Sequence, residues 1–101
     1  MNGTERIAAE RKRQIEVEGW TSDHDKQYRH NELAWAAVCY AAPENPMKKR
    51  QVFGELILFD PWPWDCKWDK RRQHNRIRQL EIAGALCAAE IDRLLAIENK
   101  Q

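Results

Sequence analysis

The stretch IRQLEIAGALCAAEIDRLLAI, residues 77–97, contains the clearest periodic pattern in this chain of 101 residues. Apolar and small side chains recur in it at spacings of three and four, which is typical of one face of an α-helix. These side chains are Ile77, Leu80, Gly84, Cys87, Ile91 and Leu94. The pattern predicts a long amphipathic helix near residues 69–98 that packs inside a small helical bundle. Its heptads are also compatible with a homo-oligomer formed through this last helix.

Residues 32–42 are predicted to form the helix against which the long helix packs. Asn31 is a typical N-cap residue, and Pro43 cannot continue a helix. Apolar residues lie on nearly every side of the segment, which indicates burial at the centre of the domain. The small residues 83–85 of the long helix would allow the two helices to approach closely.

A third helix is predicted near residues 4–18, with Thr4 as its N-cap and Gly19 as the residue that ends it. Its apolar positions are few, as expected for a helix at the surface. Together the three segments predict a mainly α fold: a small three-helix domain that occupies residues 1–101 as a single unit.

The connection between the second and last helices is rich in Trp and Pro. Residues 60–65 read Asp-Pro-Trp-Pro-Trp-Asp, and the alternating prolines exclude a helix there. The apolar residues 52–59 are compatible with a short strand or hairpin and also with a tight apolar loop, because a lone strand has nothing to pair with. Residues 43–50 are interpreted as a linker.

The charge balance disfavours several classes of partner. There are 17 Lys and Arg residues and 16 Asp and Glu residues, so the net charge is +1. Such a chain has no global field that would draw it onto nucleic acid or an anionic membrane. No segment approaches the roughly 20 apolar residues needed to span a bilayer, and the N-terminus has no apolar core of a signal peptide. We therefore expect a cytoplasmic protein.

The three cysteines, Cys39, Cys66 and Cys87, lie far apart in the sequence. Their odd number and the lack of a Cys-x-x-Cys pair disfavour a disulfide framework or a zinc site. We expect reduced thiols, with Cys39 and Cys87 packed as small apolar side chains.

Imidazole and carboxylate groups are concentrated just before the second helix. The candidates for ligands of a divalent metal are His24, Asp25, His30 and Glu32. Their spacing matches no metal-binding motif, and a solvated loop whose Asp residues cap turns is the simpler interpretation. A metal here would indicate a small metal-dependent hydrolase of nucleotides or phosphoesters. Without it, no cofactor is expected.

Tryptophan and arginine are concentrated at the predicted start of the last helix. The candidates for binding a ligand or partner are Trp62, Trp64, Trp68, Arg71, Arg72 and Arg76. Cations near a helix N-terminus oppose the helix dipole, so their placement needs a reason. Trp and Arg dominate interface energies, and Arg also binds phosphates and carboxylates. The alternative is that these arginines pair with acidic residues of the first helix and the polar loop.

Several short pieces of the sequence resemble a group of small phage and prophage proteins, most of them without an assigned function. The pieces are Glu5-Arg6, Arg13-Gln14-Ile15, Glu18-Gly19-Trp20-Thr21, His24-Asp25, Glu32-Leu33, Ala36-Ala37, Tyr40-Ala41, Trp62-Pro-Trp-Asp65, Arg71-Arg72, Ala83-Gly-Ala-Leu86 and Ala89-Glu90-Ile91. Residues 44–59 lie outside the resemblance and look like an insertion. Lys26 stands where the similar proteins tend to carry an Asp, which weakens the metal-site hypothesis.

The resemblance implies a virus-derived protein that acts in the cytoplasm of a host cell. Phage accessory proteins of this size are often binders, such as inhibitors of host defence complexes or sequesterers of nucleotides. We therefore expect a phage-type accessory protein that binds a host protein or an anionic or nucleotide ligand, rather than an enzyme.

Overall fold

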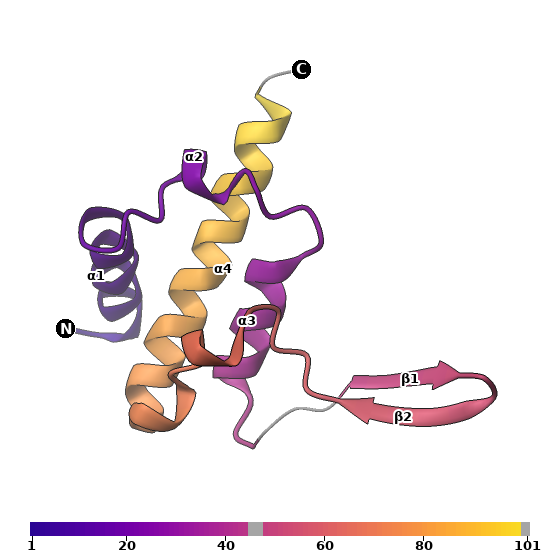
Figure 1. Cartoon of the computed structure of the whole chain (residues 1–101). Helices are drawn as coiled ribbons and strands as arrows, with labels where there is room; N and C mark the ends of the chain where they lie inside the picture. Colours follow the sequence, from indigo (N-terminus) through magenta and orange to yellow (C-terminus); the bar gives the residue numbers. More distant parts are fainter. Residues whose placement is uncertain (45–47, 100–101) are drawn as a thin grey trace.

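The computed structural model describes residues 1–44 and 48–99, and the chain is mainly α, as its sequence predicts (Figure 1). Its elements in chain order are α1 (Gly3–Glu16), α2 (Ser22–Asp25), α3 (Glu32–Ala41), β1 (Lys48–Val52), β2 (Glu55–Phe59), the 3₁₀ helices η1 (Cys66–Trp68) and η2 (Arg71–Gln73), and α4 (Arg76–Glu98). The long helix α4 lies at the centre, and α1, α2 and α3 all contact it.

The core lies between α3 and one face of α4. From α3 it takes Leu33, Ala36, Ala37 and Tyr40, and from α4 it takes Ile82, Ala83, Leu86 and Ala89. Many of these side chains are small, so the two helices can approach closely, as predicted. Buried Cys39 is also as predicted, whereas Cys87 is exposed.

The predicted apolar face of α4 is not the face that the core buries. Ile77, Leu80, Ile91 and Leu94 are all 45–63% exposed. Gly84 is the exception among the predicted positions, because α1 covers it. The prediction was wrong because α4 carries apolar residues on two opposite sides, and the longer periodic run belongs to the outer one.

α4 begins at Arg76 and not near residue 69 as predicted. Local side-chain hydrogen bonds to the backbone replace helical ones in the preceding segment. The Asp69 carboxylate accepts from the Arg71 N–H at 3.2 Å, and the Gln79 amide donates to the Arg71 carbonyl at 2.9 Å. Asn75 then caps α4 by accepting from the Arg78 N–H at 2.9 Å.

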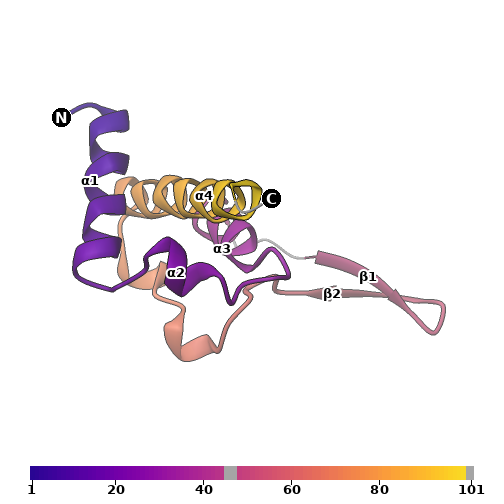
Figure 2. The same ribbon diagram turned by 90° about the horizontal axis from the view of Figure 1, so that it is seen from above.

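Helix α1 crosses α4 at a steep angle, and Gly84 lies at the crossing (Figure 2). A Cβ atom at Gly84 would lie 2.6 Å from Cδ1 and 2.8 Å from Cγ1 of Ile7. The glycine therefore sets how closely the two helices approach.

Ion pairs fasten α1 at both sides of this crossing. Glu10 of α1, whose side chain is 1% exposed, accepts from Arg13 at 2.7 Å and from Arg78 of α4 at 2.5 Å. Burial alone would raise the pKa of Glu10, but hydrogen bonds from the two arginines hold it below its ordinary value. Arg11 pairs with Asp92 at 3.3 Å. Ion pairs thus hold α1 on both sides of its contact with Gly84.

The two predicted N-caps differ in detail, and a further short helix has a cap of its own. Asn2, not Thr4, caps α1 through a capping box with Glu5. Thr21 caps the short helix α2. Asn31 occupies the N-cap position of α3 with φ of 62°, and its side chain makes no capping bond.

Strands β1 and β2 form an antiparallel hairpin in which Lys48 pairs with Phe59 and Val52 with Glu55. Phe53 and Gly54 form its two-residue turn with φ of 51° and 80°, the left-handed conformation that such turns require. The strand alternative is correct for residues 55–59, and the linker interpretation is wrong for residues 48–50 because they supply the pairing strand. Figures 1 and 2 show the hairpin extending away from the helices.

Gly84→Ala is expected to lower the midpoint of thermal unfolding. Overpacking against Ile7 costs about 1–3 kcal/mol, which outweighs the roughly 1 kcal/mol that Ala gains in helix propensity. Calorimetry of the variant and of the double variant with Ile7→Ala measures this, since removing the Ile7 side chain should relieve the overlap. Gly3→Ala is the control, because a Cβ there meets nothing within 4 Å. A Gly84→Ala chain as stable as wild type would contradict the close crossing.

Candidate functional site

The two tryptophans of the Trp/Pro connection pack onto the edge of the core. The ring of Trp62 lies 5.9 Å from that of Tyr40 in α3, and the ring of Trp64 lies 5.4 Å from that of Tyr28. The two indoles contact each other edge to face at 5.4 Å. Trp62 and Trp64, both partly buried, are thus side chains that hold the connection in place.

Arg71 also holds the Trp/Pro connection in place, through ion pairs. Its side chain is 10% exposed, its Nε donates to Asp69 at 2.8 Å, and it also pairs with Asp60 at 3.1 Å. The guanidinium lies 5.3 Å from the centre of the Trp62 ring. The hydrogen bond that Arg71 donates to the Asp69 carboxylate is the largest influence that raises the pKa of Arg71. The contacts of Arg71 within the chain therefore stabilise the fold.

Arg76 caps the end of α3. Its guanidinium donates to the carbonyls of Tyr40 at 3.2 Å and Ala42 at 3.1 Å, and also to the carbonyl of Ala41. The last carbonyls of a helix have no partner within it, so a cation here completes α3 and interacts favourably with its dipole. This contact gives a structural reason for the cation at the first position of α4.

Three of the six predicted binding residues, Trp68, Arg72 and Arg76, are exposed, and of these Arg76 is held by the end of α3. Trp68 is 61% exposed, with the Lys67 ammonium 5.4 Å from the ring centre. Lys70 and Arg72 are exposed too, and within the described part of the chain neither they nor Lys67 form an ion pair. We call these four residues, Lys67, Trp68, Lys70 and Arg72, the Trp68 corner.

The predicted metal-ligand residues fall into two local pairs. Nδ1 of His24 lies 2.8 Å from the buried carboxylate of Asp25, and the backbone N–H of His30 donates to the Glu32 carboxylate at 2.5 Å. Among the residues that the structure describes, no group of three or more His, Cys, Asp or Glu could hold a metal ion. The metal site stays a prediction from the sequence.

Asp25 is the most deeply buried of these residues, with a side chain 1% exposed. Burial raises the pKa of its carboxyl group, and the charge of Glu90 adds to the rise. His24, followed by Arg11, acts in the opposite direction. Oδ1 of Asp25 lies within hydrogen-bond distance of His24, whereas Oδ2 has no hydrogen-bond partner among the described residues.

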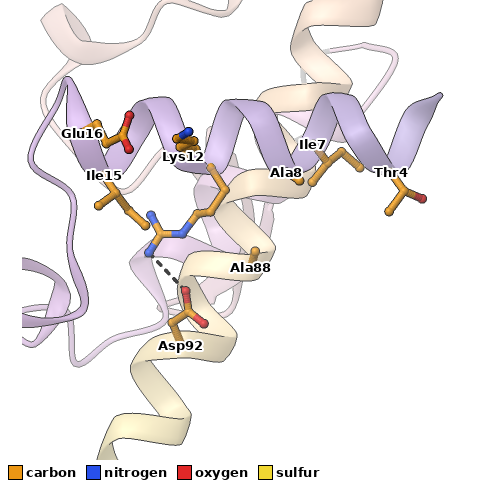
Figure 3. Close-up of a pocket in the computed structure, with 9 residues that line it drawn as sticks. Thr4, Ile7, Ala8, Lys12, Ile15, Glu16, Ala88 and Asp92 are labelled. Carbon is orange, nitrogen blue, oxygen red and sulfur yellow. Dashed lines mark hydrogen bonds and ion pairs between the residues drawn. The ribbon is translucent and has the colours of Figure 1, made fainter. Parts of the chain in front are cut away.

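One feature that the sequence did not reveal is a groove of about 580 Å³ in the corner between α1 and α4 (Figure 3). Its apolar walls are formed by Ile7, Ala8, Ile15 and Ala88, and Lys12 and Asp92 are among its polar residues. The groove exists because α1 crosses α4 steeply, and nothing in a single sequence fixes that angle.

No protein-family model, curated protein or solved structure matches this chain. Within the described residues, every helix is too short or too polar to cross a membrane. The candidate functions therefore depend on the arrangement of the side chains.

Arg71→Met is expected to lower the free energy of unfolding by about 2 kcal/mol, since it removes charged hydrogen bonds from a nearly buried position. Urea unfolding followed by tryptophan fluorescence measures the loss. Arg72→Met, at the next residue, is the matched control and should change stability by less than about 0.5 kcal/mol. Equal effects of the two variants would contradict the structural role of Arg71.

Asp25 predicts a specific pH dependence of stability. Its ordinary pKa is 3.8, and burial raises the value in the folded chain. Between the two values the folded state binds more protons than the unfolded state, so the contribution of Asp25 to stability falls as the pH rises. The stability of Asp25→Asn relative to wild type should therefore increase with pH through that interval. Urea unfolding at a series of pH values measures it, and the opposite slope would rule out burial as the dominant influence.

Proposed function

We propose that this chain is a non-enzymatic accessory protein of phage type that binds an acidic surface of a host protein, with Trp68 at the centre of the contact. The resemblance of the sequence to small phage and prophage proteins supports the virus-derived context, a counter-defence role and action in the host cytoplasm. The observation on which the binding proposal depends is the exposure of Trp68 close in sequence to Lys67, Lys70 and Arg72, which form no ion pair with the residues that the structure describes.

The exposed indole supports a binding role. A Trp side chain exposes a large apolar area to water, and covering that area on association is favourable. Trp and Arg are also the residue types that most often dominate the energy of a protein interface. An exposed Trp68, with Arg72 four residues further along the chain, therefore has the composition of an interface centre.

The segment around Trp68 is held before any partner binds. Arg71 ties η2 to Asp60 and Asp69, and Asp65 accepts from the Lys67 N–H at 2.9 Å at the start of η1. A surface that is already ordered loses little conformational entropy on binding. The structural residues of the connection, including Trp62 and Arg71, thus support the binding residues indirectly.

The charge of the corner supports an acidic partner. Lys67, Lys70 and Arg72 form no ion pair within the described chain, whereas Arg71 pairs with Asp60 and Arg76 donates to the end of α3. Unpaired surface cations select a complementary negative surface, and such attraction weakens as salt is added. A nucleotide could also stack on Trp68, and the test below separates it from a protein.

Immobilised wild-type protein is expected to retain a defined host protein from lysate, in a salt-dependent way. Trp68→Ala should weaken the complex about 30-fold, equivalent to about 2 kcal/mol. Arg72→Glu should weaken it as well, because it reverses a charge that faces the partner. Lys12→Ala, which removes an exposed cation of α1, is the matched control and should bind like wild type.

Three outcomes contradict the proposal: no retained protein, retention that Trp68→Ala leaves unchanged, or recovery only of a bound nucleotide. Purified partner and isothermal titration calorimetry then give the affinities of the four proteins. Circular dichroism confirms that each variant keeps its helices.

A further inference from the structure

One acidic residue, Asp65, lies directly beside the Trp68 corner. It is exposed, and it precedes Lys67 by two residues and Trp68 by three. A carboxylate at this place repels the acidic surface that the corner is proposed to bind, and it weakens the attraction that the three cations of the corner exert. A residue whose charge opposes the role of its surroundings needs another reason to be there.

Two hydrogen bonds to Asp65 define the 3₁₀ turn η1, which carries Trp68. The carboxylate of Asp65 is the N-cap of η1 and accepts from the backbone N–H of Lys67 at 2.9 Å. Its carbonyl accepts from the backbone N–H of Trp68 at 3.0 Å. Because the first N–H groups of a helix have no partner within it, a side-chain acceptor at this position stabilises the turn. Asp65 thus fixes the backbone of both Lys67 and Trp68.

The carbonyl of Asp65 also connects the turn to the core of the protein. It accepts from the indole N–H of Trp62 at 3.2 Å, and the Trp62 ring in turn lies 5.9 Å from that of Tyr40, a core residue. Trp64 packs beside Trp62, but its indole nitrogen has no hydrogen-bond partner among the described residues. Of the two tryptophans, Trp62 therefore connects Asp65 to the core.

With its backbone held in this turn, Lys67 lies against the side chain of Trp68. The Lys67 ammonium is 5.4 Å from the centre of the indole ring, a distance at which a cation and a ring attract each other. The ammonium occupies one face of the ring, so the opposite face is the one open to a partner. A ring that is already held in one orientation loses less rotamer entropy when a partner covers it.

We propose that Asp65 is a positioning residue of the Trp68 corner. It holds η1 in the conformation in which Trp68 and Lys67 face the partner together, and it does so although its own charge repels that partner. This inference rests on the proposed function, because the partner is the acidic surface of the host protein named there.

The cap and the charge of Asp65 can be separated by substitution. An N-cap needs an oxygen acceptor but no charge, so Asn replaces Asp in this role, whereas Ala does not. Asp65→Asn therefore removes the charge and keeps the cap, and Asp65→Ala removes both. The two variants have the same net charge, so any difference between them reports the cap.

Isothermal titration calorimetry with the purified host protein that wild type retains gives the first test. Asp65→Asn should bind this protein more tightly than wild type, because the repulsion is gone. Asp65→Ala should bind about 5-fold more weakly than Asp65→Asn, equivalent to about 1 kcal/mol for the lost cap. Equal affinities of the two variants would overturn the positioning role. An Asp65→Asn chain that binds more weakly than wild type would instead contradict the acidic partner of the proposed function.

Amide hydrogen exchange of the free chain, followed by NMR, gives a second test that needs no partner. The Lys67 amide should exchange about 5-fold faster in Asp65→Ala than in wild type, and at nearly the wild-type rate in Asp65→Asn. The amides of Ala37 and Leu86 are the internal control and should not change, because Asp65 lies outside the core. Unchanged exchange of Lys67 in Asp65→Ala would overturn the positioning role, whether or not a host protein is retained. The expected exchange without any retained host protein would contradict the proposed function and leave the capped turn intact.

Discussion

The close approach of α3 to α4 is the constraint on which the remaining structure depends. Ala36 of α3 and Ala89 of α4 are 0% and 1% exposed, and Ala37 and Ala83 belong to the same core. Small side chains let two backbones come together, but each buries little apolar area. The partly buried rings of Tyr28, Trp62 and Trp64 pack around this core and supply area that the alanines do not. The Trp/Pro connection is consequently part of the fold and not merely a link between helices.

The cations around the start of α4 separate into two groups. Arg71, Arg76 and Arg78 are held by carboxylates or by the end of α3, which offsets their unfavourable position near a helix N-terminus. Lys67, Lys70 and Arg72 precede α4, in 3₁₀ turns or beside them, and have no such partner in the described chain. One charged stretch of sequence thus contains both residues that stabilise the fold and residues available to a partner.

The sequence was sufficient to predict the three main helices, the buried position of α3 and its end at Pro43, because periodicity and proline report directly on local geometry. It did not indicate which side of α4 is buried, since apolar residues occur on both sides and only the position of α3 decides between them. For the candidate site, residue types alone indicated the region that also contains the proposed binding residues. Residue type alone does not distinguish Trp68 and Arg72, which are exposed, from Trp62 and Arg71, which contact other parts of the fold. Only the folded structure shows these contacts, although Asp69 lies just two residues before Arg71 in the sequence.

The hairpin has a consequence for how this chain can change in length. Its strands pair with each other, its turn residue Phe53 is fully exposed, and no described core residue comes from it. Segments of this kind tolerate insertion and deletion, because removing them takes no side chain out of the packed core. The hairpin is therefore a natural position for a reporter peptide or fluorescent label, remote from the α3–α4 core.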